Sequence, residues 1–135
     1  MKKFDISVCI TGHFEGILIH KTLRSISAGV NYARNKGLII ECNISLDNPD
    51  EVTINSINNF LEAEPSLKAM IYTHTFGDIS KSRNFLISKS TGKYLAFFDG
   101  DDFFTENYLY QAFTVAEQQQ EPAIYSPRYL LVFEG

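Results

Sequence analysis

The sequence of 135 residues contains no tryptophan, only two cysteines and no excess of positive charge. Its 12 Lys and Arg residues are outnumbered by 16 Asp and Glu residues, and the formal net charge is −4. A chain of this charge without a basic cluster has little attraction for a phosphate backbone, so nucleic acid is excluded as a partner. No apolar run approaches the roughly 20 residues that cross a bilayer. We expect a cytoplasmic protein without a transmembrane segment.

Cysteine, histidine and glycine patterns exclude several classes of protein. Cys9 and Cys42 lie in apolar stretches typical of strands, where buried reduced thiols are expected. The histidines are scattered and lack the spacing of zinc ligands. No Gly-x-Gly-x-x-Gly follows the first apolar run, and no P-loop is present. These absences argue against a zinc protein, a dinucleotide dehydrogenase and a P-loop enzyme.

Short apolar runs alternate with amphipathic stretches along the whole chain. We expect strands at residues 6–10, 38–46, 67–72 and 94–98 and a last extended segment at 123–133. Apolar spacings of three and four predict helices at 19–33, 54–61, 79–90 and 109–116. The turn before the second of these helices offers Asp50 as an N-cap. The alternation predicts one α/β domain, a Rossmann-like three-layer sandwich whose mostly parallel sheet carries helices on both faces.

Polar clusters follow three of the predicted strands. They occupy residues 11–15, 47–50 and 99–102. Ligands of parallel α/β sheets bind outside the carboxyl ends of the strands. We therefore expect the three clusters to meet at one edge of the sheet and to form one site.

The most specific cluster is acidic. The apolar run 94–98 ends in Asp99, Gly100, Asp101 and Asp102. Carboxylates so close together repel one another unless a cation lies among them, and a divalent metal carrying a diphosphate is the obvious candidate. Gly100 lets a bulky ligand approach the backbone. A solvated turn that caps the next helix is the structural alternative.

Other polar residues each allow a functional and a purely structural interpretation. Arg83 is either part of a polar helix face or a guanidinium aimed at phosphate or base edges. Asp47 either forms a turn or accepts a hydrogen bond from a pyrimidine N–H. His13 is more often a polar loop residue than a catalytic base. Glu15 can be simply an acid favoured near a helix N-terminus.

Several segments resemble the family 2 glycosyltransferases in order and spacing. The similar segments are 6–15, 22–26, 47–50, Ser82-Arg83-Asn84 and 90–102. The match covers nearly the whole chain, and its last segment, which ends in Asp-x-Asp, is highly specific. One departure is Thr11-Gly12, where the family often has Pro-Thr. The resemblance implies a GT-A nucleotide-sugar fold.

The resemblance also implies roles for individual residues. Asp99 and Asp101 would face the ribose and the metal-bound diphosphate, with Asp101 as the principal ligand of Mg²⁺ or Mn²⁺. Asp47 would read the base, commonly uracil, which favours a UDP-sugar. Further residues of the nucleotide pocket would be Thr11, Glu15, Arg83 and Gly100. The implied reaction is an inverting sugar transfer by direct displacement to an unknown acceptor.

The general base of the family comes from a second half of the enzyme. This chain stops at Gly135. We therefore expect residues 1–135 to form a nucleotide-sugar-binding domain that lacks the acceptor-binding half and the base. The apolar run Tyr129–Phe133 would pack against that half or against a second copy in a homo-oligomer.

Two other classes of protein are alternatives that could account for the same sequence features. One is a non-catalytic nucleotide-binding or assembly module with the same fold. The other is a phosphatase or phospho-acceptor domain, in which Asp-x-Asp also occurs. The acids of such domains follow an early strand, whereas here they follow the fourth, which argues against this class.

Overall fold

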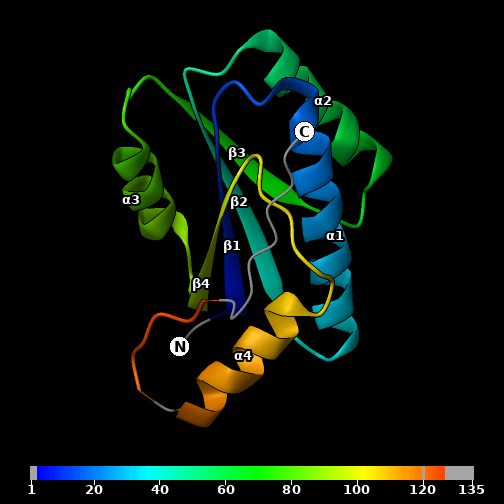
Figure 1. Ribbon diagram of the computed structural model, residues 1–135, viewed down its shortest axis with the longest axis vertical. Helices are drawn as coiled ribbons and strands as arrows, with labels where there is room; N and C mark the ends of the chain where they lie inside the picture. Colours follow the sequence, from blue (N-terminus) through cyan, green and yellow to red (C-terminus); the bar gives the residue numbers. More distant parts are fainter. Residues whose placement is uncertain (1–2, 120, 127–135) are drawn as a thin grey trace.

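The computed structural model describes residues 3–119 and 121–126. In these residues strands and helices alternate as expected (Figure 1). The elements are β1 (Phe4–Gly12), η1 (Gly16–Leu18), α1 (Ile19–Asn35), β2 (Ile40–Asp47), α2 (Glu51–Ala63), β3 (Ala69–His74), α3 (Ile79–Lys89), β4 (Gly92–Asp99) and α4 (Tyr108–Gln119). The sheet order is β3-β2-β1-β4, and every pairing is parallel. The predicted α/β fold is confirmed.

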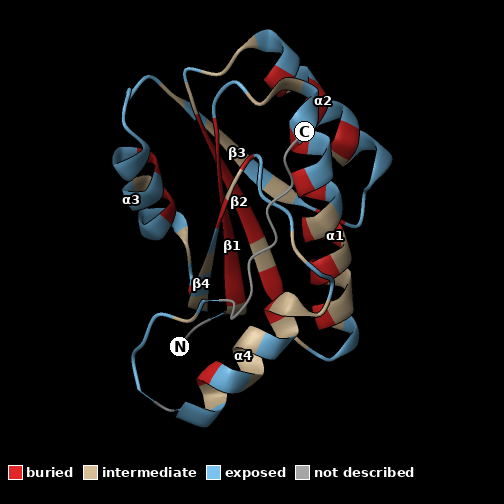
Figure 2. Cartoon of the chain, in the orientation of Figure 1, coloured by how far each residue is buried: buried red, intermediate tan, exposed pale blue. Residues whose placement is uncertain are grey.

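One face of the sheet carries the hydrophobic core. Alternate residues of the central strands point to this face, among them Val8 and Ile10 of β1 and Ile44 and Leu46 of β2, all fully buried. They pack against buried side chains of α1, α2 and α4. Figure 2 shows this buried layer as red segments of the strands and of the helix faces turned toward them. Apolar packing on this face is therefore the main interaction that holds the sheet to its helices.

On the opposite face, the part of the central strands that α3 covers is buried but polar. Cys9 of β1 and Asn43 and Ser45 of β2 lie on it, as the alternation along each strand requires. The Sγ of Cys9 lies 3.3 Å from the hydroxyl of Ser90, which follows α3. Within the described residues, Asn43 Nδ2 and the hydroxyls of Ser45 and Ser82 have no hydrogen-bond partner. This layer contributes much less hydrophobic free energy than the core.

Local signals set the ends of the helices, and the predicted N-cap of α2 is confirmed. Asp50 is the N-cap of α2, and its carboxylate accepts a hydrogen bond of 3.2 Å from the backbone N–H of Thr53. Asp78 caps α3 in the same way through the N–H of Ser80, at 2.8 Å. Gly37 follows α1 with a φ of 96°, a conformation that favours glycine. The helices therefore begin and end close to where local chemistry places them.

Only the start of the last predicted extended segment, residues 123–133, is described. Residues 121–126 form neither helix nor strand, and residues 127–135 lie outside the described part of the chain, so Tyr129–Phe133 is not described either. Pro122 lacks a backbone N–H and cannot donate to a strand ladder at that position. The outer edge of β4 has no paired strand in the described residues.

The cysteines are free and buried, as expected. Burial raises the pKa of Cys9 to about 11 and that of Cys42 to about 12, so both stay protonated at neutral pH. In the described part of the chain, every helix is too short or too polar to span a bilayer.

A glycine at the start of β4 permits the close approach of β1, and this gives a stability test. A Cβ built on Gly92 would lie 2.5 Å from the backbone nitrogen of Ser7. We expect Gly92→Ala to lower the free energy of unfolding by about 1–3 kcal/mol, because neither backbone can give way. Gly29→Ala is the control, since the nearest neighbour of its new methyl would be the side chain of Phe104, at 3.0 Å, and no backbone atom would lie closer than 3.7 Å. Urea denaturation showing equal effects of the two changes would contradict this account.

Candidate functional site

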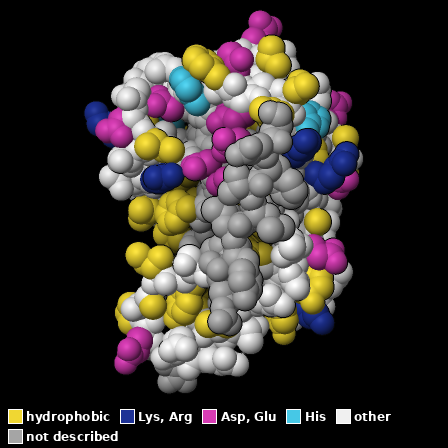
Figure 3. Space-filling view, viewed as in Figure 1, with side chains coloured by type: hydrophobic (Ala, Val, Ile, Leu, Met, Phe, Trp, Pro, Cys, Tyr) yellow, Lys and Arg dark blue, Asp and Glu magenta, His cyan; other side chains and the backbone are white. Residues whose placement is uncertain are grey.

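The carboxyl ends of the strands bring the three predicted polar clusters together. Thr11 pairs with Asp99 in the β1–β4 register, and β2 ends beside them at Asp47. A cleft of about 410 Å³ opens at this edge. Its lining residues are Thr11, Gly12, His13, Glu15, Asp47, Asn48, Gly77, Asp78, Ile79, Ser82 and Asp99. Figure 3 shows acidic side chains gathered at this end of the molecule, with Lys and Arg side chains on both sides.

The acidic turn closes on itself through Asp102. Its carboxylate accepts a hydrogen bond of 3.1 Å from the N–H of Asp99, and its own N–H donates to the Asp99 carbonyl at 3.0 Å. Asp101, by contrast, is exposed and makes no hydrogen bond or ion pair within the described residues. Asp102 therefore shapes the turn, while the Asp101 carboxylate stays available.

Asp99 is held by two neighbours. Its Oδ1 accepts hydrogen bonds from the Thr11 hydroxyl at 2.9 Å and from Arg83 Nη2 at 3.1 Å. The Arg83 and Asp99 side chains are 44% and 43% exposed. An ion pair this open to water contributes little to stability. Arg83 can therefore exchange this partner for an anionic ligand at little cost.

Gly100 is enclosed by other parts of the chain. The buried hydroxyl of Thr22 in α1 donates a hydrogen bond of 2.9 Å to the Gly100 carbonyl. A Cβ on Gly100 would lie 2.9 Å from Cδ of Glu15. The carboxylate of Glu15 in turn accepts a hydrogen bond of 2.6 Å from the N–H of His13. Glu15 thus joins the loop after β1 to the acidic turn.

Asp47 holds the loop between β3 and α3. Its two carboxylate oxygens accept hydrogen bonds from the N–H groups of Gly77 at 3.1 Å and Asp78 at 3.0 Å. Partial desolvation raises the pKa of Asp47, but backbone N–H donors in this loop outweigh it and leave the pKa below its usual value. His13 contributes to the lowering, and its Nδ1 contacts the Asp47 carbonyl oxygen. Asp47 therefore has a structural role in the wall of the cleft.

Most of the predicted site residues meet at this edge. Thr11, Glu15, Asp47 and Asp99 line the cleft, and Arg83 reaches it through its contact with Asp99. Gly100 and Asp101 belong to the adjoining acidic turn.

Some residues of this edge were given no role in the site by the sequence analysis. Asn48, Gly77, Asp78, Ile79 and Ser82 also line the cleft, and Thr22 supports the turn from behind. Gly77 and Asp78 carry a usable signal, since Gly-Asp between a strand and a helix is typical of a turn followed by an N-cap. The contact of Thr22 has no local signal, because its partner lies 78 residues away.

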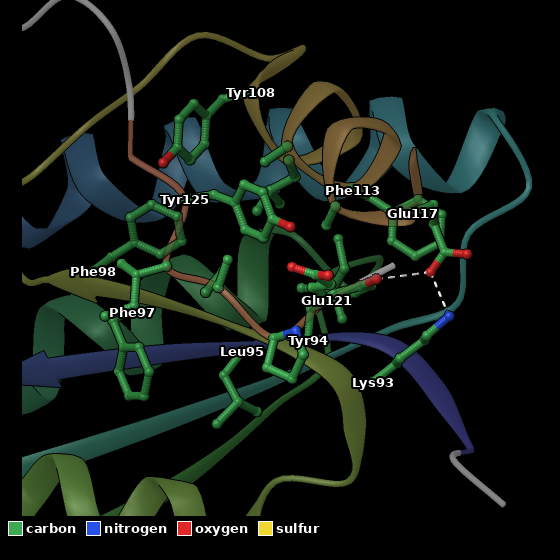
Figure 4. A pocket seen from close by; sticks show the side chains of 18 residues that line it. Lys93, Tyr94, Leu95, Phe97, Phe98, Tyr108, Phe113, Glu117, Glu121 and Tyr125 are labelled. Carbon is green, nitrogen blue, oxygen red and sulfur yellow. Dashed lines mark hydrogen bonds and ion pairs between the residues drawn. The ribbon is translucent and has the colours of Figure 1, made fainter. Parts of the chain in front are cut away.

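A larger groove of about 990 Å³ lies elsewhere, between β4 and α4 (Figure 4). Its walls are mainly apolar, and it contains none of the three polar clusters. At one end Glu117 accepts hydrogen bonds from Lys93 Nζ at 2.5 Å and from the Tyr94 hydroxyl at 3.0 Å. These bonds lower the pKa of Glu117. The groove lacks the free carboxylates of the acidic turn.

The donor set of the turn suits a hard divalent cation. Asp99, Asp101 and Asp102 can each offer one carboxylate oxygen, and these oxygens lie within 4.8 Å of one another. Oxygen ligands are those that Mg²⁺ and Mn²⁺ prefer, and the remaining positions around such an ion are commonly filled by water and phosphate. The residues present therefore fit a cation that also binds a diphosphate.

Solved structures from S. aureus and Pyrobaculum calidifontis share this fold. The S. aureus protein TarS, residues 1–349, in complex with UDP-GlcNAc, superposes with a TM-score of 0.71 at 18% identity, over 87% of this chain and 32% of that one. Mannosyltransferase PcManGT from Pyrobaculum calidifontis, in complex with GDP-Man and Mn²⁺, gives 0.70 at 20% identity, over 81% and 31%. The chain thus spans about a third of the length of these structures.

Sequence comparison assigns the family directly. No curated protein matches the chain. The glycosyl transferase family 2 pattern, however, matches residues 7–130, which include all four strands from Ser7 onward and every predicted site residue. With the GT-A fold of its structural neighbours, this shows that the chain belongs to glycosyl transferase family 2.

Proposed function

We propose that this glycosyltransferase domain binds a nucleoside-diphosphate sugar through Mg²⁺ or Mn²⁺ and takes part in an inverting sugar transfer, in the cytoplasm. The observation that carries the proposal is the free carboxylate of Asp101 beside Asp99, at the mouth of the nucleotide-sized cleft. The proposal is also supported by the fold that the chain shares with TarS in complex with UDP-GlcNAc and with PcManGT in complex with GDP-Man and Mn²⁺. A UDP-sugar is favoured as the donor.

The residues of the cleft would have different roles in binding the donor. Asp101 and Asp99 would hold the cation, which when bound supplies Lewis-acid stabilisation of the charge on the leaving diphosphate. Arg83 would exchange its exposed pairing with Asp99 for a phosphate oxygen. Thr11 and Glu15 would shape the ribose and diphosphate ends of the cleft, and Gly100, whose missing side chain makes room for Glu15, would let the acidic turn pack beside them.

Asp47 would face the nucleobase. Each carboxylate oxygen has two lone pairs, so Asp47 can tether the loop at Gly77 and Asp78 and still accept a hydrogen bond from a ring N–H. The same contacts keep its carboxyl ionised. Uracil, with one acidic ring N–H, suits such an acceptor.

The general base is proposed to lie outside the described residues. Apart from the proposed cation ligands, the described carboxylates that line the cleft already have partners: Glu15 binds the N–H of His13, Asp78 caps α3, and Asp47 holds its loop. Glu117 is bound to Lys93 and Tyr94 beside the other groove. A base must reach the acceptor hydroxyl on the face of the sugar opposite the leaving group. Residues 1–135 are thus proposed as the donor-binding part, completed by an acceptor-binding part or by a second copy through Tyr129–Phe133.

Calorimetric titration of the chain with UDP and with GDP, each with and without Mn²⁺, tests the proposed function. We expect UDP to bind more tightly than GDP and Mn²⁺ to strengthen the binding. Binding of UDP without sugar transfer, even when the acceptor-binding part is present, would favour a non-catalytic binding module. Absence of nucleotide binding in the presence of Mn²⁺ would refute the proposal.

Asp101→Asn tests the cation ligand. We expect it to abolish most of the Mn²⁺-dependent gain in UDP affinity, because an amide oxygen carries no negative charge to offer the ion. Affinity without metal should change little. Glu106→Gln removes one negative charge from an exposed position just beyond the turn and is the control. A full Mn²⁺ gain in Asp101→Asn would show that the ion binds elsewhere.

The lowered pKa of Asp47 predicts a pH-dependent contribution to stability. A carboxyl with a depressed pKa in the folded state stabilises the fold above its unfolded pKa of about 3.9, and this contribution is lost as the pH falls through the folded value. Asp47→Asn should therefore melt below the wild type at pH 7, with a gap that narrows below about pH 4. Melting curves between pH 7 and 3 measure it, with the exposed Glu62→Gln as control. A gap independent of pH would contradict the assigned hydrogen bonds.

A further inference from the structure

One hydrogen bond reaches the acidic turn from the far side of the cleft. Thr22, near the start of α1, is completely buried, and its hydroxyl donates to the carbonyl oxygen of Gly100 at 2.9 Å. The two residues are 78 positions apart in the sequence. A buried carbonyl needs such a partner, since leaving it unpaired is costly. The bond therefore attaches the turn to a helix that belongs to the rigid core.

The position of this bond within the turn gives it a particular effect. The carbonyl of Gly100 and the N–H of Asp101 belong to one planar peptide group. Holding the Gly100 oxygen therefore fixes the orientation of the peptide that leads into Asp101. Asp101 has no other hydrogen bond in the described residues that would fix it.

The remaining described contacts of the turn do not fix the orientation of the peptide that leads into Asp101. The mutual hydrogen bonds of Asp99 and Asp102 close the turn but do not involve the peptide between Gly100 and Asp101. Glu15 packs closely against Gly100 and limits its movement by contact alone. A hydroxyl in α1 is thus the only described hydrogen-bond donor that sets the direction of this peptide.

We propose that Thr22 is a positioning residue for the divalent cation: by fixing the Gly100–Asp101 peptide, it holds the Asp101 carboxylate ready for the ion. This rests on the proposed function, because it assumes that the ion binds at Asp101. A turn that is ordered in advance does not lose conformational freedom when the ion binds. Without the Thr22 hydroxyl the turn keeps its conformational freedom until the ion binds. It must lose this freedom on binding, so the ion binds more weakly.

Thr22→Val tests the proposal, since valine has nearly the same shape and no hydroxyl. The measurement is the dissociation constant of UDP by calorimetry with and without Mn²⁺, together with the free Mn²⁺ signal in electron paramagnetic resonance. We expect the gain that Mn²⁺ gives to fall about five- to tenfold, the usual effect of one buried hydrogen bond. Affinity for UDP without metal should stay at the wild-type value.

Two further variants separate positioning from general loss of stability. Thr22→Ser retains the hydroxyl and should keep the Mn²⁺ gain within about twofold of the wild type, far from the loss expected for one hydrogen bond. Ile26→Val, on the buried face of the same helix, should lower stability and leave the gain unchanged. Thr22→Ala serves the same purpose as Thr22→Val if the valine variant does not fold.

The outcomes distinguish this inference from the proposed function. A wild-type Mn²⁺ gain in Thr22→Val or Thr22→Ala would overturn the role of Thr22 and leave the cation site in place. If Thr22→Ser and Ile26→Val lost as much of the Mn²⁺ gain as Thr22→Val, the role of Thr22 would also be overturned, because the loss would then follow from reduced stability alone. A wild-type chain with no Mn²⁺ gain at all would remove the proposed cation site, and the inference with it.

Discussion

In the parallel register of β1 and β4, Thr11 lies beside Asp99, so the loops that follow the two strands leave the sheet side by side. Every feature of the cleft depends on this pairing. A shift of one residue would turn Asp99 to the opposite face, where the hydrophobic core lies. Gly92 allows the two backbones to approach at the start of β4, and the apolar side chains on the core face fix the register along its length.

The two faces of the sheet serve different purposes. The core face packs against α1, α2 and α4 and supplies most of the hydrophobic free energy. On the face under α3 the central strands β1 and β2 carry small and polar side chains, and this part of the face leads directly into the cleft at Thr11 and Asp47. The polar lining of the site is thus a continuation of one face of the sheet. The apolar groove beside α4 belongs to the other face and to the outer edge of β4.

Much of this arrangement could be predicted from the sequence, because it follows from local patterns. The apolar periodicity located all four strands and all four α-helices, and the parallel topology then placed Asp47 and Asp99 at one edge. Boundaries were less accurate: β3 begins at Ala69, although the apolar run begins at Leu67, which is buried before the strand starts. Burial and strand pairing coincide only in part, so a hydrophobic run alone does not define the ends of a strand.

The supporting contacts of the site could not be predicted in this way. Whether Thr22 reaches Gly100 depends on the packing angle of α1 against the sheet, which no local pattern encodes. The tether from Asp47 to Gly77 and Asp78 likewise depends on the path of a loop between two distant elements. The proposed ligand-binding residues were found from family patterns, whereas the contacts that hold them in place are determined by tertiary structure.

The polar layer beneath α3 has a consequence for how the domain moves. Because Asn43, Ser45 and Ser82 leave polar atoms unpaired there, lifting this helix exposes groups that gain hydrogen bonds from water. Local opening therefore costs less free energy for α3 than for α1, whose buried face is mainly apolar. Arg83 is thus carried by a helix that opens more easily than α1, the helix to which Thr22 attaches the acidic turn.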